Sequence, residues 1–243
     1  MPPQPAVLSL RSVAVIGAAI GAIAALAPTL VLANAERAER LTRMALELDA
    51  SQARGASLYR SQCADCHGAK AHGDAQRSIP ALAGQRRAYV IKQLVDFVER
   101  DRSATQMHAV ISGEPLGEPQ TWADIALYVN RLAPLTAAQT GDGRFLSLGE
   151  ASYEQWCASC HEADGRGDDD GFVPSLRNQH YAYLLKEMRG LAAGHRFNVE
   201  TELSRFLKSL ESEEMMGLAD HLSRMSGPLQ ARERLNVDGT VSD

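Results

Sequence analysis

The sequence CADCH at residues 63–67 and the sequence CASCH at residues 157–161 are two copies of one pattern, set 94 positions apart. Cys-x-x-Cys-His is the attachment motif of c-type haem, in which two thiols bond to the porphyrin and the histidine ligates the iron. Positions one and four of a helical turn face the same side, so both thiols can reach one edge of the ring. The pattern predicts two covalently bound c-type haems, attached and ligated by six residues: Cys63, Cys66, His67, Cys157, Cys160 and His161.

All four cysteines of the 243-residue chain belong to these two motifs. No thiol therefore remains for a structural disulfide or a catalytic nucleophile. Paired Cys-x-x-Cys motifs can also form a zinc ribbon, but there the pairs usually lie within about twenty residues of each other. The long separation and the two histidines that follow the cysteines argue against zinc.

Charge is distributed unevenly along the chain, whose formal net charge is −5. Residues 51–134 contain 10 basic and 8 acidic residues, whereas residues 141–243 contain 11 basic and 18 acidic residues. Such a difference can arise by drift of surface charge, or it can orient the molecule against redox partners of opposite sign. The basic residues are dispersed and the aromatic residues are sparse, so nothing predicts nucleic-acid binding.

The amino-terminal segment, residues 1–35, contains an uncharged apolar run at residues 13–32. Followed by Ala33-Asn34-Ala35, this run has the form of a cleaved signal peptide. About twenty residues at ~1.5 Å each would also cross a hydrocarbon core of ~30 Å, so a membrane anchor is the alternative interpretation, and the cleavage signature favours the signal peptide. Both interpretations predict a periplasmic protein, either soluble after cleavage or tethered to the inner membrane.

The segment that follows, residues 36–50, is charged and has Leu41, Met44 and Leu48 at helical spacing. It is longer than the first haem domain requires. We expect either a spacer that holds this domain away from a membrane or an additional helix packed on the domain.

An internal repeat extends well beyond the two haem motifs. The repeat predicts two tandem domains, at residues 51–134 and 144–228, joined by a linker at residues 135–143 and followed by a tail at residues 229–243. A shift of 94 residues aligns Gly55 with Gly149, Tyr59 with Tyr153, Pro80 with Pro174, Gln85 with Gln179, Tyr89 with Tyr183 and Arg102 with Arg196.

Each unit of the repeat is expected to be all-α, since no segment alternates convincingly as a strand. Helices are predicted near residues 50–63 and 144–157, near 86–99 and 180–193, and in the closing segments 122–132 and 215–225. Small domains of this kind bury little apolar surface by themselves, so we expect the haem to supply much of each core.

The haem motifs, the Pro-x-Leu segments at Pro80 and Pro174, and the Gln-x-x-x-Tyr segments at Gln85 and Gln179 occur in the same order in both units. This ordered set resembles the dihaem class I cytochromes c of the cytochrome c4 type over residues 50–228. The resemblance implies two small class I cytochrome c domains packed about a pseudo-twofold axis. It also implies an electron carrier of the periplasm rather than an enzyme, with a membrane oxidase or dehydrogenase complex as redox partner.

Proteins of this family complete the iron coordination with a methionine that follows the second helix of the domain. In the first unit Met107 occupies that place. A Met/His ligand pair favours ferrous iron and raises the reduction potential. His108, the next residue, is a rival ligand, although the family resemblance favours Met107.

The second unit departs from this pattern, because counting back from its closing segment puts Leu203 where the methionine is expected. Leucine cannot ligate iron. The sixth position of the second haem is then taken by His195, whose loop should approach the open face, or left open, or taken by a methionine. The methionines available are Met188, Met215 and Met216.

Three functions are consistent with these features. The leading prediction is a periplasmic dihaem c-type cytochrome that transfers electrons between redox partners of a respiratory chain. The alternatives are a haem enzyme or small-ligand sensor that uses the second haem, and a cytochrome subunit of a membrane oxidoreductase complex associated through residues 13–32. His72, His180 and His221 are expected to be surface residues without a role as ligands.

Overall fold

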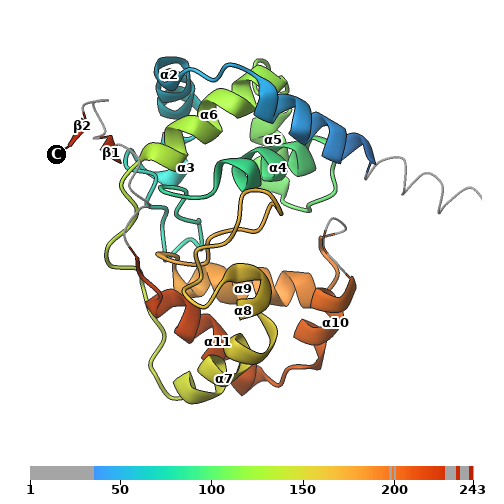
Figure 1. The fold of residues 1–243 in the computed structure, drawn as a ribbon, viewed down its shortest axis with the longest axis vertical. Coiled ribbons are helices and arrows are strands. Elements are labelled where there is room, and N and C mark those ends of the chain that lie inside the picture. Colours follow the sequence, from blue (N-terminus) through green and yellow to red (C-terminus); the bar gives the residue numbers. More distant parts are fainter. Residues whose placement is uncertain (1–35, 197–198, 200, 228–233, 236–240, 243) are drawn as a thin grey trace, which may run out of the picture.

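The protein folds as two helical units, one above the other in Figure 1. A computed structural model describes residues 36–196, 199, 201–227, 234–235 and 241–242. Each unit arranges its helices around an apolar core of its own. The predicted all-α fold of two tandem domains is confirmed.

The first unit begins at Ser51, whose hydroxyl accepts a hydrogen bond from the backbone N–H of Arg54 at 3.3 Å and so caps the first helix. Pro119 opens the last helix of the unit, where its missing N–H costs no helical hydrogen bond. The helices are α2 (Gln52–Gln62), α3 (Ala64–His67), α4 (Arg87–Val98), α5 (Thr105–Ile111) and α6 (Pro119–Arg131).

The second unit repeats this order of helices. Glu211 and Glu214 form a reciprocal capping box at the start of its last helix. The helices are α7 (Leu146–Trp156), α8 (Ala158–His161), α9 (Tyr181–Ala192), α10 (Thr201–Ser209) and α11 (Ser212–Arg224).

In each unit the first helix crosses the last helix at a glycine. Gly55 on α2 lies against the backbone carbonyl of Asp124 on α6, and Gly149 on α7 lies against the carbonyl of Gly217 on α11. A side chain at either glycine would overlap that carbonyl, so the close crossing requires glycine. The glycine pair found in the sequence repeat therefore marks a repeated helix crossing.

One turn further along, each crossing is filled by a pair of rings. The centroids of Tyr59 and Tyr128 are 5.4 Å apart with the ring planes at 47°. Tyr153 and His221 repeat this contact at 5.4 Å and 43°. All three tyrosines are buried, so their rings form part of the two cores.

The units meet through reciprocal hydrogen bonds between equivalent positions of the repeat. The Gln85 side chain donates to the Ser175 carbonyl at 2.9 Å and accepts from the Ser175 N–H at 2.8 Å. Gln179 makes the same two bonds with Ala81, at 2.9 and 3.0 Å. Each unit contributes one glutamine and one backbone segment that binds the glutamine of the other unit. The two sets of hydrogen bonds are therefore related to each other by a pseudo-twofold axis.

A second set of contacts lies around the buried guanidinium of Arg102, which is 7% exposed. It donates to the Tyr183 hydroxyl at 2.9 Å, to the Glu187 carboxylate at 2.8 Å and to the Gln93 side chain at 2.7 Å. Arg196, its repeat equivalent, donates to Gln93 at 2.8 Å and lies 3.5 Å from Glu187. Burial alone would lower the pKa of Arg102, but Tyr183 and Glu187 raise it, so the guanidinium stays charged.

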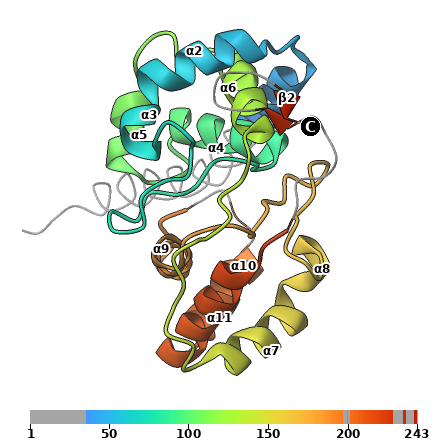
Figure 2. The ribbon, with the colours of Figure 1, turned by 90° about the vertical axis from the view of Figure 1, so that its left-hand side faces the viewer.

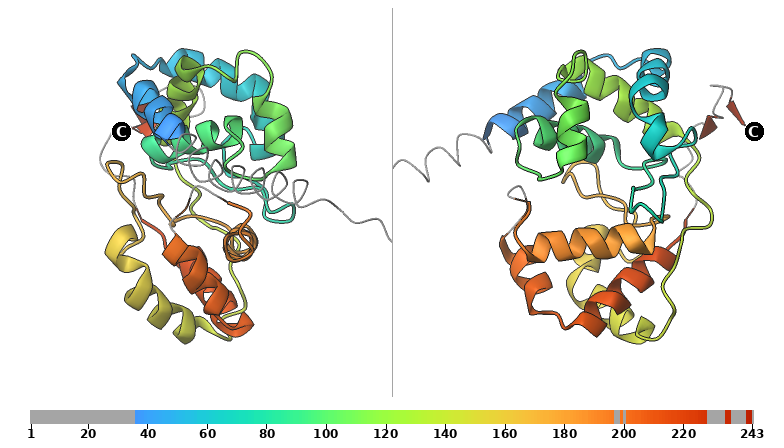
Figure 3. Two further views of the ribbon diagram at one scale, coloured as in Figure 1. Left: turned by 90° about the vertical axis from the view of Figure 1, so that its right-hand side faces the viewer. Right: turned by 180° about the vertical axis from the view of Figure 1, so that it is seen from behind.

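A third pair of equivalent residues corrects one prediction. Arg86 donates to the Arg166 carbonyl of the second unit at 2.8 Å, and the His180 ring binds the His72 carbonyl of the first unit at 2.9 Å. His180 is 7% exposed. The prediction of a surface residue is therefore wrong for His180, because its position in the repeat is an interface position. Figures 2 and 3 show α9, which begins directly after His180, at the side of the second unit that faces the first.

A further helix spans residues 36–47 and packs on the first unit (blue in Figure 1). Ala38, Thr42 and Ala45 are its buried residues. Met44 is 43% exposed, so it does not belong to the buried face that its spacing predicted. Small residues on the buried face allow the helix backbone to approach the unit closely.

Two arginines of this helix contact residues of the two haem units. Arg37 pairs with Glu99 of the first unit at 3.0 Å. The Arg43 guanidinium lies 5.6 Å from the centroid of the Phe172 ring in the second unit. The packing fits an additional helix on the domain rather than a free spacer.

Within the described part of the chain, no helix is both long and apolar enough to cross a membrane. The apolar run at residues 13–32 and the cleavage site at residues 33–35 lie outside the described residues. The absence of strands was predicted, but β1 (Arg234–Leu235) and β2 (Val241–Ser242) form a short antiparallel pair after the second unit.

Candidate haem sites

The first cysteine of each motif lies at the junction of two helices, and the second lies on the short helix that follows. Cys63 follows α2 and Cys66 lies on the short α3, while Cys157 and Cys160 hold the same places around α7 and α8. All four thiols are free of disulfides. Burial, with a smaller contribution from the neighbouring cysteine, raises the pKa of both Cys63 and Cys157 to about 11. The first thiol of each motif is half-buried and the second is exposed.

The motif histidines are held in the same way in both units. The Nδ1 of His67 lies 3.0 Å from the Pro80 carbonyl, and the Nδ1 of His161 lies 3.0 Å from the Pro174 carbonyl. A carbonyl only accepts, so Nδ1 carries the proton and Nε2 keeps its lone pair for a metal. Burial lowers the pKa of both histidines despite the opposing effect of these carbonyls, which favours the neutral ring.

These donors fit a covalently attached haem. Each unit offers two thiols one helical turn apart and a neutral histidine directly after them, with its second nitrogen fixed by a backbone carbonyl. A haem-ligating histidine is normally oriented by such a hydrogen bond on its far nitrogen.

The backbone that follows each motif is also held by a tyrosine on the first helix of the unit, Tyr59 on α2 or Tyr153 on α7. The Tyr59 hydroxyl donates to the Gly68 carbonyl at 2.8 Å, and the Tyr153 hydroxyl donates to the Glu162 carbonyl at 2.5 Å. Gly68 has φ +78° and Glu162 has φ +67°. The same left-handed turn is therefore made by glycine in the first unit and by glutamate in the second.

The equivalence of α5 and α10 shows which residue of the second unit corresponds to Met107. Each of these helices has one buried residue, Ile111 on α5 and Leu207 on α10. Aligning these two residues places Leu203 at the position of Met107. Met107 packs against the first core, whereas Leu203 is 37% exposed. The structure thus gives the same correspondence as the sequence.

His108 is engaged away from the position of a ligand. Its Nε2 lies 2.7 Å from the Arg102 carbonyl, and its ring meets Phe97 edge-on at 6.1 Å. The histidine therefore orders the segment before α5, and Met107 remains the better candidate for the sixth ligand of the first haem.

His195 lies at the contact between the units. Its carbonyl accepts a hydrogen bond from the Ser103 N–H of the first unit at 3.1 Å, and its side chain is exposed beside Gly190. Gly190 shares a face of α9 with Tyr183 and Glu187, which bind Arg102. The buried residues of α9 that form the second core lie on another face. This location counts against His195 as a ligand of the second haem.

The methionines of the second unit occupy packing positions. Met188 and Met215 are buried in the second core. Their equivalents in the first unit are Leu94 and Trp122, neither of which can ligate iron. The positions therefore belong to the core of both units.

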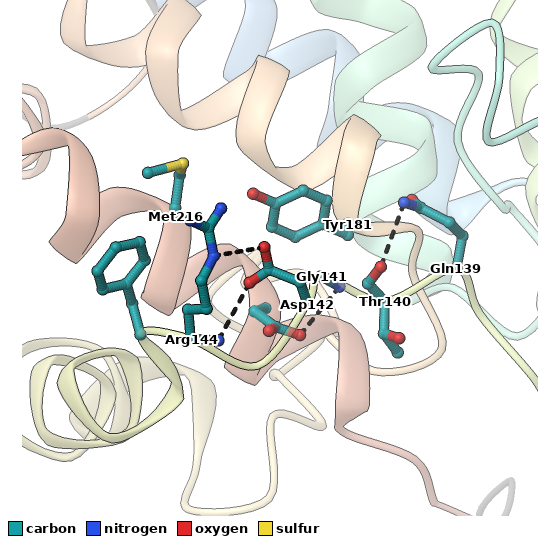
Figure 4. Close-up of a pocket in the computed structure, with 9 residues that line it drawn as sticks. Gln139, Thr140, Gly141, Asp142, Arg144, Tyr181 and Met216 are labelled. Atoms are coloured by element: carbon teal, nitrogen blue, oxygen red, sulfur yellow. Dashed lines mark hydrogen bonds and ion pairs between the residues drawn. The ribbon is translucent and has the colours of Figure 1, made fainter.

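Met216 lines a cavity of about 350 Å³ where the linker meets α9 and α11 (Figure 4). Asp220, which also lines it, is buried and accepts from the Gly141 and Gly143 N–H groups at 3.0 and 2.7 Å. Arg224 completes the pairing of this carboxylate at 2.8 Å. Since Asp220 is already satisfied, the cavity fits a role in linker packing rather than ligand binding.

One feature of the second unit was not foreseen from the sequence. The rings of Trp156 and Phe206 lie 5.1 Å apart with their planes at 30°. Trp156 directly precedes Cys157 and is 56% exposed, while Phe206 lies on α10. An exposed tryptophan beside a haem motif is the signal that could have drawn attention to this pair.

The repeated helical fold with two haem-attachment sites defines a dihaem c-type cytochrome. Residues 50–129 match the family model for cytochrome C oxidase, cbb3-type, subunit III, and residues 146–223 match the model for cytochrome c. Cytochrome c4 of Pseudomonas aeruginosa is 31% identical over 143 residues, which are 56% of this chain and 69% of that protein. The chain belongs to the cytochrome c4 family.

Two further comparisons extend this assignment. The thiosulfate dehydrogenase electron acceptor of Stutzerimonas stutzeri is 29% identical over 181 residues, covering 70% of this chain and 82% of that protein. The crystal structure of reduced recombinant cytochrome c4 from Pseudomonas stutzeri covers 73% of this chain and all of its own, with a TM-score of 0.63 and 24% identity. The similarity to this crystal structure supports the assignment of the fold. The prediction of two covalent c-type haems is confirmed.

Proposed function

We propose that this dihaem electron-transfer protein works in the periplasm and carries electrons between the redox proteins of a respiratory chain. The observation that carries the proposal is that the backbone beside each proximal histidine site is hydrogen-bonded to a glutamine of the other unit. The Pro80 carbonyl that orients His67 is followed at once by Ala81. Gln179 of the other unit binds both backbone groups of Ala81.

The same connection runs in the opposite direction. The Pro174 carbonyl orients His161, and the next residue, Ser175, is bound through both backbone groups by Gln85 of the first unit. Two such links fix the proximal backbone of each site against the other unit. A fixed surrounding keeps the structural change on electron transfer small, which a fast carrier requires.

We assign thioether attachment of the first haem to Cys63 and Cys66, with His67 and Met107 as its axial ligands. A c-type haem supplies reversible one-electron oxidation and reduction of its iron. Met107 on α5 would supply a sulfur ligand, which favours the ferrous state.

We assign attachment of the second haem to Cys157 and Cys160, with His161 as its only protein axial ligand. His195 lies at the contact between the units and Leu203 offers no electron pair. On this assignment the two haems have different sixth positions and hence different reduction potentials.

A membrane oxidase or dehydrogenase complex is the class of partner that we propose. One relative in the family is named an electron acceptor of thiosulfate dehydrogenase, which supports a role beside a dehydrogenase. The first unit has a small excess of basic residues and the second a large excess of acidic residues. Partners of opposite surface charge would therefore meet opposite ends of the molecule.

The test uses full-length protein with both haems, reduced and then mixed with membranes of the source organism. We expect oxygen-dependent reoxidation of the haems that slows as the salt concentration rises. Ferricyanide serves as a control that both haems are redox-active. Membranes that leave the protein reduced, while ferricyanide oxidises it, would overturn the proposed partner. Fractionation with a salt wash then shows whether the mature protein is soluble or tethered.

A further inference from the structure

We propose that the second haem iron keeps a free sixth position beside an apolar face of α10, and that this position binds a small neutral diatomic molecule such as carbon monoxide or nitric oxide. The proposal rests on the ligand assignment above and adds a binding function to the electron carrier.

The first step is the vacancy that the protein leaves at the iron. The buried pair Ile111 and Leu207 fixes α10 in register with α5, so Leu203 stands where Met107 stands in the first unit. A hydrocarbon side chain has no electron pair to donate. The histidine nearest in sequence, His195, is at the contact between the units.

The second step is the chemistry of the helix face that carries Leu203. Residues 203, 206 and 207 share one face of α10, and all three are apolar: Leu203, Phe206 and Leu207. The charged residues of α10 nearby, Glu202, Arg205 and Lys208, are exposed. This face offers no hydrogen-bond donor.

An apolar face selects among iron ligands. An anion such as cyanide or azide would lose its hydration there without gaining a hydrogen bond. A neutral diatomic molecule loses little hydration and binds ferrous iron directly. This apolar face therefore fits carbon monoxide or nitric oxide better than an anion.

The third step is the aromatic pair that connects the two sides of the site. Trp156 directly precedes the attachment cysteine, whereas Phe206 comes from the helix of the sixth position. Their ring contact at 5.1 Å therefore joins the end of α7, directly before the attachment motif, to α10. The equivalent residues in the first unit are Gln62 and Val110, which cannot form a ring pair. We infer that the pair narrows the access route to the second iron.

The main experiment titrates the dithionite-reduced, full-length dihaem protein with carbon monoxide and follows the absorption spectrum. We expect one carbon monoxide per two haems. Leu203→Met should supply a sulfur ligand and reduce binding to none, whereas Met107→Leu should open the first iron and raise binding to two per chain. The two variants are matched, because each gives one unit the residue of the other.

Several results would overturn the proposal. They are a wild-type protein that binds no carbon monoxide, a wild-type protein that binds two per chain, or a Leu203→Met variant that still binds one. Oxygen-dependent reoxidation by membranes, measured on the same samples, reports transfer to a redox partner separately, so failure of this inference is distinguishable from failure of the proposed function.

The role of the aromatic pair is tested by flash photolysis of the carbon monoxide complex. Trp156→Gln and Phe206→Val give the second unit the residues of the first. Each should speed rebinding by about 2- to 10-fold, the range expected for loss of one aromatic pair. Val110→Ala in the first unit is the control and should leave the rate unchanged. Rebinding that is unchanged in both aromatic variants would remove Trp156 and Phe206 from the access route.

Discussion

The two haem units are alike on the side where the haem is attached and differ on the opposite side. Both fix the motif histidine to a proline carbonyl at 3.0 Å, and both cross their first and last helices at a glycine. On the opposite side the first unit has Met107, whereas the second has Leu203.

This difference follows from what each side contacts. The proximal segments of both units are also the interface, where Gln85 and Gln179 bind the backbone beside the prolines. A change there would disturb both sites and the contact between them. The helices α5 and α10 take no part in these glutamine–backbone hydrogen bonds between the units. Their residues can therefore diverge and give the two irons different properties.

The largest expected effect comes from removing Met107, the proposed sulfur ligand of the first unit. Met107→Leu should lower the reduction potential of the first haem by on the order of 0.2 V, because axial ligands set haem potentials over a wide range. Potentiometric titration of both haems measures the shift, and the weak far-red band of an iron–methionine bond should disappear. The variant makes the first unit resemble the second. An unchanged potential would show that Met107 is not the ligand.

The next effect separates the two equivalent arginines of the interface. Arg102→Ala should cost about 3 kcal/mol of unfolding free energy, because it removes a buried cation that binds Glu187 and Tyr183. Arg196→Ala should cost roughly 1 kcal/mol, since Glu187 then keeps its short bond with Arg102. Denaturant unfolding of the dihaem protein measures both. Equal losses would mean that the interface is more symmetric than these distances indicate.

Much of this arrangement could be predicted from the sequence. The two motifs identified the haems, and the repeat predicted two units because Gly55 and Gly149, or Gln85 and Gln179, do the same structural work in each. The presence of Leu203 at the position of Met107 could also be predicted, because the sequence repeat shows directly that a leucine replaces the methionine.

Contacts between the units could not be predicted, because they depend on how two surfaces meet. His180 is a polar residue of a type expected at the surface, yet it is buried against the His72 carbonyl. Met44 has helical spacing with Leu41 but lies on an exposed part of the helix. Trp156 and Phe206 are separated by fifty residues, and nothing in their spacing predicts their contact.

A smaller effect distinguishes the acids that anchor the closing helices. Asp124 accepts hydrogen bonds from the Ser51 N–H and the Arg54 guanidinium, both at 2.6 Å, and so ties α6 to the start of α2. Asp220 instead ties α11 to the linker through Gly141. Asp124→Asn should cost about 1.5–3 kcal/mol at neutral pH, the usual range for hydrogen bonds to a charged group.

The pH dependence of Asp124→Asn follows from its surroundings. Burial alone would raise the pKa of Asp124, but the hydrogen bonds from Arg54 and Ser51 hold it below its usual value. Its contribution is therefore complete above the pKa of the unfolded state and is lost as the pH falls through the lower pKa of the folded state. The stability difference between wild type and variant should shrink below about pH 4. A difference that stays constant into acid would contradict this assignment.

The smallest effect concerns the turn after each haem motif. Glu162 holds φ +67°, a conformation that costs a side chain about 1 kcal/mol, whereas the equivalent Gly68 holds φ +78° at little cost. Glu162→Gly should raise the unfolding free energy by about 0.5 kcal/mol, since the added freedom of glycine in the unfolded chain offsets part of the gain. The exposed pair of Glu162 with Arg166, at 3.4 Å, contributes little to the balance.

The reverse change in the first unit completes this comparison. No atom lies within 4 Å of a Cβ placed at Gly68, so Gly68→Glu meets no steric clash and should cost stability through its backbone alone. Denaturant unfolding of both variants should therefore give shifts of opposite sign and similar size. Shifts of the same sign would mean that the residue after the motif acts through its side chain. The left-handed turn would then not explain why the two units tolerate different residues at this position.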